Sequence, residues 1–102
     1  MKGKRLSLDG LSLFYAGNDK AHFRVGISVS KKLANAVKRN RLKRQIRNSV
    51  MNALSRHSLG YDLVFVARRE LTAAGYEQIA KAVEAILRRT ILRNQHPEGT
   101  NP

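Results

Sequence analysis

The sequence predicts an α+β fold, a mixed β-sheet sandwich whose elements run in the order βββαβα. Apolar residues alternate with a period of two in the first third of the chain, and they recur every three or four residues in two later segments. Such an order places helices in a layer against a sheet. With 102 residues, 42% of them hydrophobic, the chain can build one modest core. We assign residues 1–94 to a single domain and residues 95–102, which have no pattern, to a flexible C-terminal tail.

Four segments have the pattern of strands. Residues 4–8 and 11–16 flank Asp9-Gly10, a typical hairpin turn. Residues 23–30 alternate between an apolar face and a small, polar face that contains Arg24, Gly26, Ser28 and Ser30. The short connections favour an antiparallel meander of these three strands. Residues 61–67 are nearly all apolar, as expected of a central strand covered on both faces.

Two segments have the period of helices. The first is predicted over residues 36–56, with Asn35 as its N-cap. The second is predicted over residues 75–93. Their apolar stripes are Leu42, Ile46, Val50 and Ala53 or Leu54 in the first, and Ile79, Val83, Ile86, Leu87 and Thr90 or Ile91 in the second. If the first helix joins two parallel strands, the general rule predicts a right-handed crossover.

The charge of the chain indicates a polyanionic partner. Twenty Lys and Arg oppose seven Asp and Glu, and the stretch between Lys20 and Tyr61 holds eleven of these basic residues and no acid. Nucleic acid is the commonest partner of such a surface. Cysteine is absent, which excludes disulfides and thiolate metal sites. No apolar run has the length of a membrane span or the position of a signal peptide, so we expect a soluble, cytoplasmic protein without a membrane partner.

The basic residues concentrate on the first predicted helix. Six of the ten residues 38–47 are Lys or Arg. Like charges one turn apart repel by a few tenths of a kcal/mol per pair, and phosphates relieve this repulsion. Lys31 and Lys32 precede the helix N-terminus, which itself favours anions. A solvated basic face is the alternative interpretation. The predicted RNA-binding residues are Lys31, Lys32, Lys38, Arg39, Asn40, Arg41, Lys43, Arg44 and Arg47.

These residues carry a resemblance to a known family. Residues 26–32 (Gly-Ile-Ser-Val-Ser-Lys-Lys), residues 35–37 (Asn-Ala-Val) and the Arg-Asn-Arg motif at Arg39, Asn40 and Arg41 resemble the bacterial ribonuclease P protein component. The similarity extends over residues 11–92. It implies a protein subunit that binds the catalytic RNA through the Arg-Asn-Arg helix and assists cleavage of precursor tRNA to release the 5′ leader. It also implies that Mg²⁺ serves the RNA's chemistry, with no catalytic residue or metal site in the protein alone, and that the βαβ crossover is left-handed.

The resemblance further implies a cleft for the single-stranded leader, between the basic helix and an exposed sheet face. The small, polar face of residues 24–30 would let nucleotides lie close, and the ring of Phe14 or Tyr15 would stack on a base. These two rings point to opposite faces, so one of them belongs to the core. The predicted cleft residues are Phe14, Arg24, Ser28, Ser30 and Arg68. Family members begin with a helix that borders this cleft, and few residues precede the first strand here. We therefore expect sheet surface to be left open, which would permit copies of the chain to associate, and the oligomeric state stays undetermined.

Three other functions compete with this interpretation. An independent nuclease would need acid–base residues brought together, but His22, His57 and His96 are far apart in sequence and no catalytic motif surrounds them. A ribosomal or other structural RNA-binding protein would share the basic helix. A DNA-binding helix would need a partner helix at helix–turn–helix spacing, which the order of elements does not provide.

Overall fold

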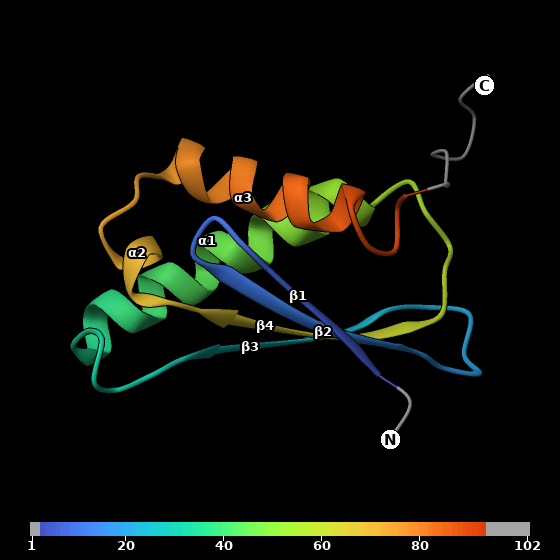
Figure 1. The fold of residues 1–102 in the computed structure, drawn as a ribbon, viewed down its shortest axis with the longest axis horizontal. Helices are drawn as coiled ribbons and strands as arrows, with labels where there is room; N and C mark the ends of the chain where they lie inside the picture. Colours follow the sequence, from blue (N-terminus) through green and yellow to red (C-terminus); the bar gives the residue numbers. More distant parts are fainter. Residues whose placement is uncertain (1–2, 94–102) are drawn as a thin grey trace.

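The structure is a computed structural model that describes residues 3–93. A four-stranded sheet is covered on one face by two long helices (Figure 1). The elements are β1 (Lys4–Leu8), β2 (Leu11–Gly17), β3 (Arg24–Val29), α1 (Ala36–Leu54), β4 (Tyr61–Ala67), α2 (Arg69–Thr72) and α3 (Tyr76–Arg88). This confirms the predicted α+β class. The predicted C-terminal tail lies outside the described residues.

The strand order β1-β2-β4-β3 corrects the expected meander. β1 and β2 form the predicted antiparallel hairpin, with both Asp9 and Gly10 at positive φ. β3, however, pairs only with β4, in parallel, and β4 pairs on its other side with β2. β4 takes the central position because its Leu63, Phe65 and Ala67 are almost fully buried. The handedness of the β3–α1–β4 crossover stays a prediction.

The core lies between the sheet and the helices. Leu11 and Leu13 of β2 and Phe65 of β4 are fully buried beneath the apolar stripes of α1 and α3. Both predicted stripes are confirmed. Leu54 rather than Ala53 is the buried residue in the first stripe, and Ile91 rather than Thr90 in the second. α3 ends at Arg88 rather than at Arg93, and the short α2 was not predicted.

The opposite side of the sheet, which we call the open face, carries no helix among residues 3–93. The pairing register aligns its side chains in rows across the strands: Ser7, Ser12, Val66 and Ser28; then Arg5, Phe14, Val64 and Gly26; then Ala16, Asp62 and Arg24. Val64 is 44% exposed. The prediction that β4 is covered on both faces is therefore wrong for the described part of the chain, because a uniformly apolar strand does not reveal which face is covered.

Candidate nucleic-acid interface

The start of α1 is fixed by hydrogen bonds from two side chains. The Oδ1 atom of Asn35 accepts a hydrogen bond from the backbone N–H of Lys38 at 2.9 Å, which confirms the predicted N-cap. The half-buried Arg39 side chain adds a second bond, because its Nη1 atom donates to the carbonyl oxygen of Ala34 at 3.0 Å. These bonds join the first turn of α1 to the connection that precedes it, so the Arg-Asn-Arg motif begins on an ordered turn.

The basic side chains of α1 lie away from the core. Leu42, Ile46 and Val50 face the sheet and α3, whereas Asn40, Arg41, Arg44 and Arg47 are exposed and Lys38, Arg39 and Lys43 are half-buried. Lys31 and Lys32 are exposed in the turn before the helix. The first turn contains no acidic residue, and among residues 3–93 no acid forms an ion pair with any basic residue of α1 at 38–47. This cationic surface therefore has no intramolecular counterion in the described structure.

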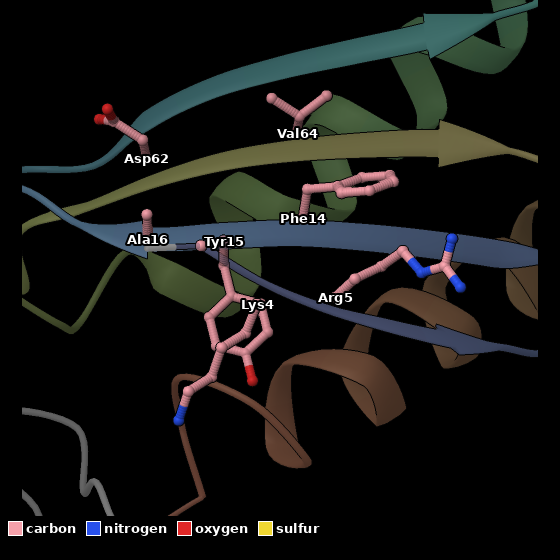
Figure 2. A pocket seen from close by; sticks show the side chains of 8 residues that line it. Lys4, Arg5, Phe14, Tyr15, Ala16, Asp62 and Val64 are labelled. Atoms are coloured by element: carbon pink, nitrogen blue, oxygen red, sulfur yellow. The ribbon is translucent and has the colours of Figure 1, made fainter. Parts of the chain in front are cut away.

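The open face contains a hollow of about 360 Å³ around Phe14 (Figure 2). The Phe14 ring is 41% exposed, and the Arg5 guanidinium carbon lies 5.8 Å from the ring centroid. Val64, Ala16 and Tyr15 also line the hollow. Tyr15 is partly buried against the core whereas Phe14 is exposed, so Phe14 is the ring available for stacking. A half-exposed aromatic ring beside a guanidinium suits a nucleobase and its phosphate.

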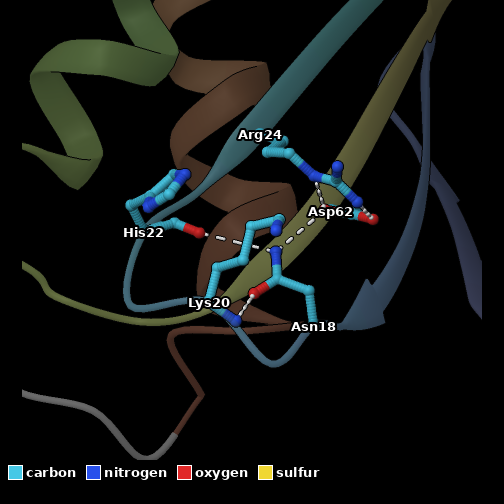
Figure 3. Close-up of polar contacts among 5 residues, drawn as sticks. All are labelled: Asn18, Lys20, His22, Arg24 and Asp62. Carbon is cyan, nitrogen blue, oxygen red and sulfur yellow. Dashed lines mark hydrogen bonds and ion pairs between the residues drawn. The ribbon is translucent and has the colours of Figure 1, made fainter.

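Arg24 is bound to an acid rather than free. Its Nε and Nη2 atoms donate to the two carboxylate oxygens of Asp62 at 2.7 and 2.6 Å, and Asn18 Nδ2 donates to the same carboxylate at 2.8 Å (Figure 3). The Arg24 and Asn18 hydrogen bonds lower the pKa of Asp62 from 3.8 to about 2. Asn18 also bonds the backbone of Lys20 and His22. This cluster joins β3 and β4 to the loop that follows β2.

The remaining predicted cleft residues lie at the other end of the sheet. Ser28 is exposed on the open face, and Ser30 follows β3, where its Oγ atom accepts a hydrogen bond from the Lys32 backbone N–H at 3.2 Å. Arg68 follows β4, and its Nη1 atom donates to Ser12 Oγ at 3.4 Å. Arg68 and Lys31 both add positive charge at the end of the sheet where β3 and β4 terminate.

The helix and the open face do not form two facing walls. α1 packs on the covered side of the sheet, against β3, whereas Arg24, Gly26 and Ser28 of β3 belong to the open face. α1 and the open face come closest along the chain after β3, where residues 30–35, which include Lys31, connect this strand to α1. A nucleic acid that contacted both would pass around this edge of the sheet.

Sequence reasoning missed several residues of the open face. Arg5, Val64 and Asp62 line the hollow beside Phe14. Asp62 is the one polar residue on this side of β4, and the apolar residues Val64 and Val66 beside it hid that signal. The partnership of Asp62 with Arg24 depends on the parallel β3/β4 register, which no local pattern reveals.

No group of three or more His, Cys, Asp or Glu among residues 3–93 is placed to hold a metal ion. His96, one of the three histidines of the sequence, lies outside the described range. Within residues 3–93, no helix is both long and apolar enough to cross a bilayer.

Comparison with known proteins identifies the family. Residues 1–91 match the family model described as Ribonuclease P. Proteins of Streptococcus pneumoniae named "Ribonuclease P protein component" are 45% identical over 71 residues, which is 70% of this chain and 58% of theirs. The chain thus spans less than two thirds of their length.

Solved structures agree with this match. The RNase P protein of Staphylococcus aureus superposes with a TM-score of 0.79 at 36% identity, covering 86% of this chain and 81% of that one. The RNase P protein of Thermotoga maritima superposes with a TM-score of 0.78 at 25% identity, covering 86% of this chain and 84% of that one. The chain therefore belongs to the ribonuclease P protein family.

Proposed function

We propose that this protein is the protein subunit of ribonuclease P, a ribonucleoprotein endoribonuclease, and that it assists the 5′ maturation of tRNA by binding both the catalytic RNA and the precursor-tRNA leader. The observation that carries the proposal is the basic surface of α1. It presents Arg39, Asn40 and Arg41 on a capped helix, and no acid within residues 3–93 is paired with its cations. The family match directs this surface toward RNA.

The RNA contact follows from the chemistry of the side chains. Arginine donates two parallel hydrogen bonds to one phosphate, and the helix N-terminus adds favourable partial charge. The cap at Asn35 orders the first turn before RNA arrives, so less conformational entropy is lost on binding. If about six phosphates are neutralised, the logarithm of the affinity falls against the logarithm of the salt concentration with a slope near −4 to −5.

The open face supports the leader contact. The small side chains of Gly26 and Ser28 let a strand of nucleotides lie close to the sheet, and Phe14 supplies an exposed ring. Rows of side chains along a strand are about 6.8 Å apart, because each row is two residues from the next. Single-stranded nucleic acid binds such surfaces through stacking and backbone contacts.

We assign the bond cleavage to the RNA, with Mg²⁺ as the ion that serves it. As the family resemblance implies, we place no metal site in the protein alone. The protein lowers the electrostatic cost of bringing two polyanions together, which makes the reaction less dependent on Mg²⁺. A precursor-tRNA substrate and a cytoplasmic location belong to the same proposal.

The test is reconstitution with the cognate RNA. We expect the protein to accelerate precursor-tRNA cleavage at low Mg²⁺ concentration, and we expect Arg39→Ala/Arg41→Ala to abolish this gain. Lys20→Ala/Lys81→Ala, at exposed positions outside α1, is the matched two-charge control and should retain most of it. An unchanged rate in the double variant, or cleavage by the purified protein without RNA, would contradict the proposal.

A further inference from the structure

A second group of cations lies at the far end of the molecule. Arg88, Arg89 and Arg93 line a hollow of about 380 Å³ together with Leu6 of β1. All three arginines are exposed. We call them the C-terminal arginine cluster. In Figure 1, where the long axis is horizontal, α1 begins toward the left end of the molecule and α3 ends on the right-hand side. α1 is a helix of 19 residues. A helix of that length spans about 28 Å.

Stabilisation of a helix end is the simplest explanation for cations at this place, but α3 already has other partners for its last carbonyl groups. The carbonyl oxygen of Ala85 accepts from the Arg89 backbone N–H at 3.2 Å, and that of Leu87 accepts from the Leu92 backbone N–H at 2.9 Å. The Thr90 hydroxyl donates to the carbonyl of Ile86 at 2.8 Å. The arginine side chains are therefore not needed as caps.

Ion pairs among the described residues leave most of this charge uncompensated. The Arg88 guanidinium lies 2.7 Å from the Glu84 carboxylate, and this pair is exposed on α3. Within residues 3–93, Arg89 and Arg93 form no ion pair. Both arise from a turn that is anchored to the core by Ile91, which is 5% exposed, and by Leu92. The cluster is thus built on an ordered segment with an apolar side chain at its base.

We propose that the C-terminal arginine cluster is a second phosphate-binding surface, which takes the backbone of an RNA segment other than the one bound at the start of α1. The ligand is the phosphodiester backbone, because arginine forks match phosphate and none of the described residues that line the hollow is aromatic. The inference rests on the proposed function in one respect, that the partner is RNA. Its consequence is that the protein joins two RNA segments, one at the start of α1 and one at the end of α3.

The test is the salt dependence of binding to the ribonuclease P RNA alone and to precursor tRNA alone. For at least one of the two RNAs, Arg89→Gln/Arg93→Gln should reduce the magnitude of the log–log salt slope by about 2, one for each phosphate that the variant no longer neutralises. The matched control is Lys20→Gln/Lys81→Gln, which removes the same charge from exposed positions elsewhere. We expect its slope to stay within about 0.5 of the wild-type value, since distant charges are screened by salt.

A charge-retaining variant, Arg89→Lys/Arg93→Lys, should recover most of the slope. The inference is overturned if the glutamine variant and the control reduce the slope equally, or if neither RNA distinguishes the glutamine variant from wild type. Failure of the proposed function gives a different result, because the wild-type protein itself would then bind neither RNA. Thermal melting of each variant confirms that the fold is retained.

Discussion

Asn35 provides a direct test of how the RNA-binding helix is held in place. Its Oδ1 atom accepts the hydrogen bond that caps α1, and the first turn of α1 has no acidic residue to take over this role. Replacing such a cap by alanine costs about 1 kcal/mol. For a domain of about 100 residues, this loss lowers Tm by roughly 5 °C. We therefore expect Asn35→Ala to melt about 5 °C below wild type, measured by circular dichroism at two ionic strengths.

The same substitution should weaken RNA binding, because the frayed turn carries Lys38 and the Arg39–Ala34 hydrogen bond. If RNA binds only the ordered first turn, and ordering that turn without its cap costs about 1 kcal/mol, Kd rises about fivefold. Asn35→Asp is the matched control, since a carboxylate also caps the helix and favours its positive end. Asn35→Asp should therefore retain the wild-type Tm. A Tm reduction of less than about 2 °C in Asn35→Ala, or an equal reduction in both variants, would refute the reasoning.

Three further predictions concern the sheet. Gly60→Ala should destabilise the fold by about 1–3 kcal/mol in urea unfolding, because the new Cβ would overlap the Lys20 carbonyl oxygen. Gly17→Ala is the control and should cost much less, because no atom lies within 4 Å of the Cβ it would add. Equal losses of stability in the two variants would contradict this account. Asp62→Asn should flatten the dependence of unfolding free energy on pH. The pKa of the wild-type carboxylate is lowered from 3.8 to about 2, so its contribution to the stability of the fold is complete above about pH 4 and is lost as the pH falls through 2. If the stability of Asp62→Asn fell between pH 4 and pH 2 as steeply as that of wild type, the result would argue against the Arg24 bond. Phe14→Ala should leave Tm within about 2 °C of wild type but weaken binding of precursor tRNA by about 1–3 kcal/mol relative to leaderless tRNA, and an equal weakening for both RNAs would exclude leader stacking.

Patterns that depend on neighbouring residues were readable from the sequence. The stripe containing Leu42 and Ile46, the cap at Asn35 and the hairpin at Asp9-Gly10 all follow from spacing or turn chemistry within a few positions. The basic surface of α1 was predicted for the same reason. Its residues share one helix, so the helical period alone determines which of them face solvent.

Features that depend on pairing between distant segments were not readable. The position of β4 between β2 and β3, and with it the meeting of Arg24 and Asp62, requires the sheet register. The nearly all-apolar sequence of β4 hid the exposure of Val64. The end of α3 at Arg88 was missed because Ile91 continues the apolar period into a turn that packs on the same core.

The position of β4 also constrains how the chain acquires its shape. β2 and β3 both lack their central partner until residues 61–67 have been made, although the β1–β2 hairpin can close locally. Until then, backbone N–H and C=O groups along one side of β2 and of β3 stay unpaired and can pair with strands of other chains. Closure of the sheet brings together segments about 50 residues apart, and such non-local pairing is slow. We therefore expect truncation before Tyr61 to yield an aggregating fragment rather than a smaller domain, even though the RNA-binding helix is already complete.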